Sequence, residues 1–249
     1  MDKVHWIFVA LLMLTSTVLN AQDATEIVRR ADLQLRGESS ETEMTMLIER
    51  PTWSRSVSMK AWSKGTDYSL ILITAPARDR GTTFLKRNKE IWNWVPSIGR
   101  SVKLPPSMMM QSWMGSDFTN DDLVRESSSV TDYNHTFVRM DTMDEYQVYI
   151  IDMIPKPDAA VIWGRVRTYI EKDHYLQLRV EFYDEYDDLI NVMQGDSVKM
   201  FDGRLLPSRM VITPQDKPGH RTILEYHSMK FDVNITESFF SIQNMRRVE

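Results

Sequence analysis

The sequence predicts a mainly β protein of the α+β class, in which one curved antiparallel sheet follows a single helix. Three observations favour this fold: roughly ten short strand-like segments at even spacing, one amphipathic helical segment ahead of them, and one apolar helical insertion between them. The chain contains no linker, low-complexity tract or internal repeat. We therefore expect one domain, residues 22–249, behind a signal peptide, residues 1–21.

The first 21 residues have the layout of a secretory signal peptide. A weakly charged head precedes an apolar stretch from Val4 to Val18, and Ala21 provides a small residue at a cleavage point. This stretch is short for a transmembrane helix, so an uncleaved anchor is the alternative. The chain has no cysteine, which excludes disulfides and a lipid-bearing cysteine and favours a bacterial periplasm over a eukaryotic extracellular space.

An amphipathic helix is predicted over residues 23–36, close to the expected mature N-terminus. Asp23 and Glu26 form a plausible capping pair at its start, and Gly37 is a natural stop. The apolar residues that recur at helical spacing are Ile27, Val28, Ala31 and Leu35.

From Glu41 onwards the apolar period changes to two, which is typical of strands with one buried face. Residues 82–87 and 90–95 are predicted to form a hairpin that turns at Asn88. The other predicted strands are residues 44–48, 57–61, 68–74, 130–140, 146–154, 160–171, 176–183, 189–193, 197–201, 207–213, 222–229 and 231–235, and a last helical turn lies at 237–241.

The segment from Leu104 to Phe118 interrupts the strands with four methionines and a tryptophan. Ser107 is expected to cap a short helix that Gly115 ends, and Thr119 is expected to begin a second short helix. Methionine side chains adapt to irregular space and to different partners. The segment is therefore either a movable apolar lid over a cavity or ordinary core packing under a sheet.

Trp92 and Trp94 are two residues apart, so they share one face of a predicted strand. If that face is concave, the two rings can line a cavity for a lipid or an acyl chain. The alternative is that they fill the core, as buried aromatic side chains commonly do.

No pattern in the chain predicts catalysis, a metal site or a cofactor. The carboxylates at 184–188 lack the glycine and spacing of an EF-hand loop and are expected to lie in a solvated turn. The histidines show no metal-ligand spacing, and there is no nucleophile elbow or phosphate-binding glycine loop. The net charge of −5 argues against nucleic acid as a partner.

The order of motifs resembles the outer membrane lipoprotein-sorting proteins of the LolA-like superfamily, over essentially the whole mature chain. The most specific motif is Gly-Ser-Asp-Phe-Thr-Asn-Asp-Asp-Leu at 115–123. The other segments that carry the resemblance are the expected helix at 24–36, residues 90–96 and 100–103, residues 180–184, and residues 231–235 with Phe239 and Phe240.

The resemblance implies a half-open β-barrel with short helices plugging its open side and an apolar cavity between them. It also implies a monomeric periplasmic carrier of lipids or lipoprotein acyl chains, which works with an RND-type exporter or an outer-membrane acceptor. LolA carriers hold their lid closed with an arginine, to which no single arginine of this chain aligns. The residues that the resemblance assigns to lipid binding and to the plug are Trp92, Trp94, Met108, Met109, Met110, Trp113, Met114 and Phe118.

Two other functional classes stay open on the sequence. One is a periplasmic sensor domain that binds a lipid-like signal and a membrane signalling partner, although such proteins usually add a second domain. The other is a hydrolase of an envelope glycan or lipid, which requires acids or a nucleophile that converge in a cleft.

Overall fold

The computed structural model describes residues 21–88, 90–122, 128–159 and 161–248. The predicted signal peptide lies outside this range, apart from Ala21. Within the described chain, no helix is both long enough and apolar enough to cross a membrane.

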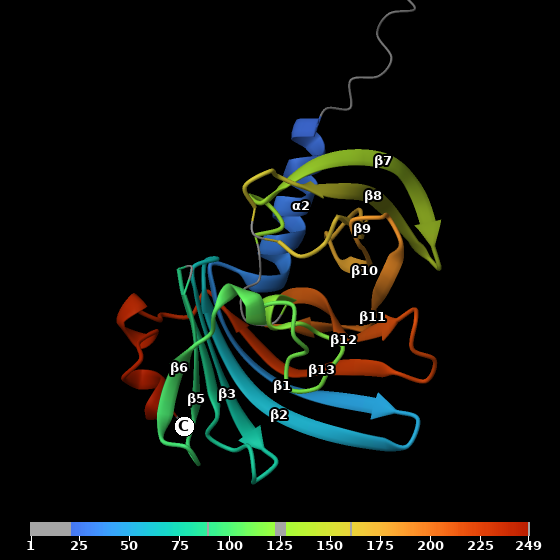
Figure 1. Ribbon diagram of the computed structural model, residues 1–249. Coiled ribbons are helices and arrows are strands. Elements are labelled where there is room, and N and C mark those ends of the chain that lie inside the picture. The colour runs from blue at the N-terminus through green and yellow to red at the C-terminus, as the bar shows by residue number, and fades with distance from the viewer. Residues whose placement is uncertain (1–20, 89, 123–127, 160, 249) are drawn as a thin grey trace, which may run out of the picture.

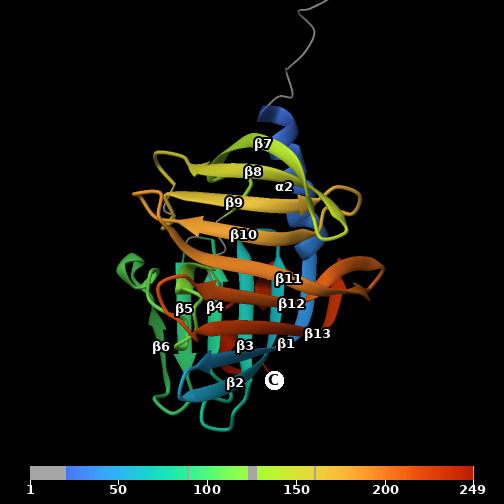
Figure 2. The same ribbon diagram turned by 90° about the vertical axis from the view of Figure 1, so that its right-hand side faces the viewer.

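Thirteen strands of the described chain form one antiparallel sheet that curves without closing (Figures 1 and 2). The strand order is β6-β5-β4-β3-β2-β1-β13-β12-β11-β10-β9-β8-β7. The strands are β1 Ser39–Arg50, β2 Trp53–Lys64, β3 Tyr68–Ala75, β4 Thr83–Arg87, β5 Glu90–Val95, β6 Arg100–Lys103, β7 Tyr133–Met143, β8 Tyr146–Pro155, β9 Arg165–Glu171, β10 Gln177–Tyr183, β11 Leu189–Phe201, β12 Arg204–Pro214 and β13 Arg221–Phe231.

This order places the insertion between β6 and β7 across the open side of the sheet. The chain builds one half of the sheet outward from β1 to β6 and the other half inward from β7 to β13, and the halves meet where β1 pairs with β13. Strands β6 and β7 are therefore the two opposite edges. The described residues of the connection between them, 104–122 and 128–132, lie over the concave face, and we call these residues the lid (Figure 1).

The predicted N-terminal helix is present as α2, Ala21–Arg36, and it packs on the half of the sheet that contains β7 to β12. Its buried side chains are Ala24, Val28 and Ala31, which lie against the concave face. Gly37 ends the helix with a φ of +64°, and its N–H donates to the carbonyl of Leu33 at 2.8 Å.

Both faces of the half-sheet from β1 to β5 are covered. On the concave face, Met46, Ile48, Val57 and Met59 pack beneath the lid, which confirms the alternation predicted for β1 and β2. On the convex face, the C-terminal segment after β13 covers a second apolar cluster (Figure 1). That segment contains the 3₁₀ turns Glu237–Phe239 and Asn244–Arg246, the first of which was predicted.

Most predicted strands are present with ends shifted by a few residues; the predicted strands 130–140 and 160–171, for example, begin at Tyr133 and Arg165. Three differences are larger. The segments 189–193 and 197–201 form one strand, because Ser197 adopts a φ of +56° and bends β11 without ending it. Residues 231–235 are not a strand, since β13 ends at Phe231 and Asp232 turns the chain with a φ of +52°. Residues 100–103 form an edge strand, β6, that the alternation did not predict.

Candidate functional site

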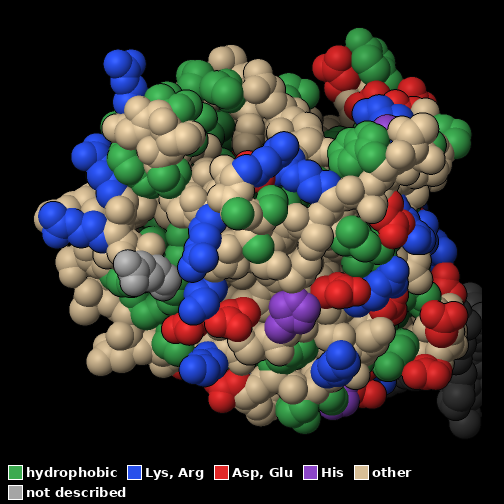
Figure 3. All heavy atoms as spheres, turned by 90° about the horizontal axis from the view of Figure 1, so that it is seen from below, with side chains coloured by type: hydrophobic (Ala, Val, Ile, Leu, Met, Phe, Trp, Pro, Cys, Tyr) green, Lys and Arg blue, Asp and Glu red, His purple; other side chains and the backbone are tan. Residues whose placement is uncertain are grey.

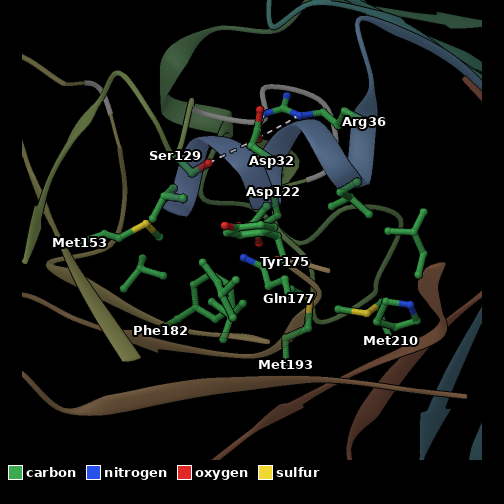
Figure 4. A pocket seen from close by; sticks show the side chains of 18 of the residues that line it. Asp32, Arg36, Asp122, Ser129, Met153, Tyr175, Gln177, Phe182, Met193 and Met210 are labelled. Carbon is green, nitrogen blue, oxygen red and sulfur yellow. Dashed lines mark hydrogen bonds and ion pairs between the residues drawn. The ribbon is translucent and has the colours of Figure 1, made fainter. Parts of the chain in front are cut away.

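A cavity of about 230 Å³ lies between α2 and the concave face of β7 to β12 (Figure 4). It exceeds the ~150 Å³ engineered apolar cavity that admits benzene. The apolar residues that line it are Val28, Ala31, Leu35, Phe118, Tyr133, Met153, Trp163, Val166, Ile170, Val180, Phe182, Met193, Leu206, Met210 and Leu224. A space of this size and lining suits an apolar chain.

One wall of the cavity is polar, and α2 provides two of its charged side chains. Asp32 and Arg36 lie one turn apart on the helix and form an ion pair whose side chains are largely buried. Ser129, at the far end of the lid, donates a hydrogen bond from Oγ to Asp32 at 3.4 Å. Figure 4 shows these three groups together above the apolar part of the cavity.

Asp122 brings a second carboxylate to the cavity, at the start of the second short helix in the lid. Thr119 and Asp122 cap each other: the Thr119 N–H donates to Asp122 Oδ2 at 2.8 Å, and the Asp122 N–H donates to Thr119 Oγ1 at 3.1 Å. Trp163 Nε1 lies 3.5 Å from Asp122 Oδ1. The helix predicted to begin at Thr119 is confirmed over residues 120–122, and residues 123–127 lie outside the described chain.

Burial raises the pKa of the Asp122 carboxyl, although the Thr119 and Trp163 donors partly oppose this. Asp122 then binds its proton more tightly in the folded than in the unfolded state, so its stabilising contribution is greatest at low pH and is lost as pH rises through the folded pKa.

We expect Asp122→Asn, whose side chain stays neutral at every pH, to raise the free energy of unfolding more at pH 7 than at pH 4, as measured by urea denaturation. Asp158→Asn, at an exposed carboxylate, is the control. If Asp122→Asn changed the free energy of unfolding equally at both pH values, the raised pKa of Asp122 would be contradicted.

The lid inserts three buried side chains, Met109, Trp113 and Phe118, into the concave face of β1 to β5. Trp113 is fully buried, with its ring centroid 5.1 Å from that of Phe84. Among the described residues, no acceptor lies within hydrogen-bond reach of Trp113 Nε1. An unsatisfied buried N–H costs about 1–3 kcal/mol. This cost makes the free energy of docking the lid on the sheet less favourable.

The other predicted lid methionines are placed differently. Met108 and Met114 are half-buried and pack on the edge of the same cluster. The Met110 side chain is 68% exposed and faces away from the sheet. Met109 and Met110 therefore provide neighbouring buried and exposed positions for a matched comparison.

The predicted helix at Ser107 is a single 3₁₀ turn, Pro106–Met108. Pro105 occupies the N-cap position without a side-chain hydrogen bond, so the expected capping role of Ser107 is wrong. The segment is instead held by hydrogen bonds across the lid, such as Asn120 Nδ2 to the Met108 carbonyl at 2.8 Å. Gly115, with a φ of +82°, belongs to the turn at the tip of the lid.

Arg50, at the end of β1, fastens this tip to the sheet. Its Nη1 pairs with Asp117 Oδ2 at 2.9 Å, and its Nη2 donates to the Gly115 carbonyl at 2.9 Å. Thr222 Oγ1 also donates to Asp117 Oδ2, at 2.7 Å. The Arg50 and Asp117 side chains are only 8% and 7% exposed, which makes this ion pair a desolvated one.

His135 connects the other end of the lid to α2. His135 Nε2 lies 2.7 Å from the Ser129 carbonyl, and Nδ1 lies 3.0 Å from Thr25 Oγ1. Since a carbonyl only accepts, Nε2 must carry a proton, and burial lowers the pKa of the ring. The lid is thus held at its tip by β1 and at its far end by β7 and α2.

Trp92 and Trp94 do not line the cavity. They share one face of β5, as predicted, but that face is convex, and they pack beneath Phe239, Phe240 and Met245 of the C-terminal segment. Strand alternation fixed their common side, but which side is concave depends on the curvature of the sheet. The structure separates both residues from the lid.

The carboxylates at 184–188 form the turn between β10 and β11, as predicted. Asp184 Oδ1 accepts hydrogen bonds from the backbone N–H groups of Tyr186 and Asp188 at 2.9 and 3.0 Å. Within the part of the chain that the structure describes, no group of three or more His, Asp or Glu residues is arranged to hold a metal ion.

A family model with the description "Uncharacterized protein" matches residues 65–247, which is more than half of the chain. The chain belongs to this family. No curated protein sequence matches it.

Three solved structures show that this family member has the LolA-like fold. A protein described as an outer membrane lipoprotein-sorting protein domain, from Vibrio parahaemolyticus, aligns with a TM-score of 0.80 and 22% identity over 92% of this chain and 100% of its own. A DUF1329 family protein from Desulfovibrio piger aligns with a TM-score of 0.81 and 24% identity over 90% and 98%. A LolA superfamily protein from Nitrosomonas europaea aligns with a TM-score of 0.76 and 22% identity over 88% and 98%.

Sequence reasoning about this LolA-like chain did not identify two parts of the site. The first is the contact of Arg50 with Asp117, whose residues are 67 positions apart. The second is the cavity wall, although the alternation in β8 to β10 already contained a signal. Met153, Val166 and Val180 are each apolar residues of the alternating pattern in a predicted strand.

Proposed function

We propose that the protein is a periplasmic carrier that binds lipid or lipoprotein acyl chains on the concave face of its sheet. The observation that carries the proposal is the apolar cavity of about 230 Å³ beside a lid that fills the rest of that face with Met109, Trp113 and Phe118. Phe118 both lines the cavity and packs in the cluster beneath the lid, so it lies at the boundary of the two regions.

The energetics of acyl chains explain why such a site is useful. Each methylene group that leaves water contributes roughly 0.8 kcal/mol, so a long chain needs an apolar enclosure to cross an aqueous compartment. Release of the acyl chain requires that other apolar groups take its place on the concave face of the sheet. The lid provides this replacement, since its contacts with the sheet and those of the cargo are mutually exclusive.

The proposal includes delivery toward the outer membrane, with an RND-type exporter or an outer-membrane acceptor as partner. Support comes from the similarity of the fold to a lipoprotein-sorting domain and from the layout of residues 1–21. The proposed role is binding and transfer, without a catalytic step.

Native mass spectrometry of protein purified from its own periplasm, followed by lipid extraction, tests the proposal. We expect a stoichiometric lipid or acylated peptide. Met153→Glu, which places a carboxylate on the apolar wall of the cavity, is expected to abolish this adduct. An empty wild-type protein that also fails to take up fluorescent lipid would contradict the carrier function.

The two neighbouring methionines test the role of the lid. Met109→Glu buries a charge between lid and sheet, so it should favour the open lid and raise the apparent affinity for a fluorescent fatty acid by about tenfold or more. Met110→Glu changes an exposed side chain and should leave the affinity within about twofold. Equal affinities for both variants would show that the lid does not compete with cargo.

A further inference from the structure

Three connections of the sheet converge at one end of the molecule. They are the β1–β2 turn at residues 50–53, the β3–β4 connection at 76–82 and the β5–β6 turn at 96–99. Strand register fixes their proximity, because Ser58 pairs with Ala75 and Thr83 pairs with Trp94. We call these three connections the rim, and they lie at the bottom and lower right of Figure 1.

The rim is a basic part of an acidic protein. The rim and the adjoining Arg100 contain four Arg residues and one Asp residue, whereas the whole chain has a net charge of −5. Arg78, Arg80 and Arg100 are exposed at or beside the rim. In Figure 3, which views this end from below, basic and hydrophobic side chains lie together on the left, and most acidic side chains lie on the right.

Two large apolar side chains of the rim are also exposed. Trp53, at the β1–β2 turn, is 50% exposed, and Ile98, at the β5–β6 turn, is 66% exposed. They lie on separate turns. Tryptophan is enriched where proteins meet the membrane–water interface, and basic residues are attracted to anionic head groups.

We propose that the rim binds the surface of an anionic lipid bilayer, with Trp53 and Ile98 entering the interfacial layer and Arg78, Arg80 and Arg100 contacting head groups. Charge complementarity favours this partner, since each basic residue near an anionic surface contributes roughly fivefold to the affinity. The inference concerns a surface distinct from the cavity and does not depend on which cargo the cavity holds.

The rim also adjoins the fastened tip of the lid. The guanidinium carbon of Arg50 lies 5.7 Å from the centroid of the Trp53 ring, and the same guanidinium pairs with Asp117 in the lid. Binding through Trp53 therefore brings the lid tip to the bilayer surface, where a cargo would be taken up or released. The geometry joins the membrane-binding residue to the lid through a single side chain.

Co-sedimentation of the purified mature protein with vesicles tests the proposal. We expect binding to vesicles that contain phosphatidylglycerol, weak binding to vesicles of phosphatidylcholine alone, and loss of binding as salt is raised. Trp53→Ala with Ile98→Ala, and separately Arg78→Glu with Arg80→Glu, should each lower the affinity by about tenfold or more. Arg139→Glu with Met140→Ala, at exposed positions on β7, should leave it unchanged.

Absence of binding to anionic vesicles at low salt would overturn the proposal, as would equal binding by the rim and β7 variants. Rim variants that bind vesicles normally but lose a periplasmic protein partner would also overturn it in favour of a protein-docking surface. Uptake of a soluble fluorescent fatty acid should be normal in the variant with Arg78→Glu and Arg80→Glu. That readout separates failure of membrane binding from failure of the carrier function.

Discussion

Replacing Arg50 by methionine is expected to release the lid. The change leaves the Asp117 carboxylate buried with Thr222 Oγ1 as a remaining donor, and it removes the donor to the Gly115 carbonyl. Breaking a buried ion pair from one side costs about 3–5 kcal/mol. The protein can avoid this cost by moving Asp117 into water, which requires the lid tip to leave the sheet.

Hydrogen exchange of residues 106–122 measures this effect. In Arg50→Met we expect amide exchange in the lid to be about 10²-fold faster or more. The change in the strands should be smaller, because the lid can open while the sheet stays folded. Arg221→Met is the matched control, since Arg221 pairs with Glu49 beside the same tip but is 50% exposed. Arg50→Met combined with Asp117→Leu should restore slow exchange, because no charge is then left unpaired.

If Arg50→Met and Arg221→Met changed lid exchange equally, the contact of Arg50 with Asp117 would not hold the lid. A released lid should also raise the apparent affinity for acyl chains, because more of the protein is open to cargo.

Trp113→Ala is expected to have the second large effect. Trp113 is fully buried against Phe84, and truncation of a buried aromatic side chain typically costs about 3–5 kcal/mol. The loss should appear as weaker docking of the lid and faster exchange across residues 106–122. It should also raise the affinity for cargo, since Trp113 occupies part of the concave face.

Trp113→Phe separates packing from hydrogen bonding. It keeps an aromatic ring and removes the Nε1–H group, which has no partner among the described residues. The removed N–H penalty of about 1–3 kcal/mol offsets the lost volume, so Trp113→Phe should stay within about 1 kcal/mol of the wild type. For both variants, chemical denaturation measures the free energy of unfolding and hydrogen exchange of residues 106–122 measures docking of the lid. Equal losses in Trp113→Ala and Trp113→Phe would mean that the indole N–H contributes to lid docking.

The sequence alone determined the local elements, because these depend on neighbours along the chain. Alternation predicted which residues of β1 and β2 share a face, and Met46, Ile48, Val57 and Met59 are buried together. Helical periodicity and Gly37 predicted α2 and its end. The apolar stretch at 104–118 predicted an insertion that packs on the sheet, and the motif order predicted the LolA-like fold.

Only the tertiary structure decided which side of the sheet is concave. Alternation places Trp92 and Trp94 on a common face, but the curvature of thirteen paired strands makes that face convex and leaves it to the C-terminal segment. Pairing of β1 with β13 turns β6 and β7 into opposite edges, so the lid must cross the open side and bring Asp117 to Arg50. Long-range strand pairing fixes these relations, whereas sequence periodicity reports only local ones.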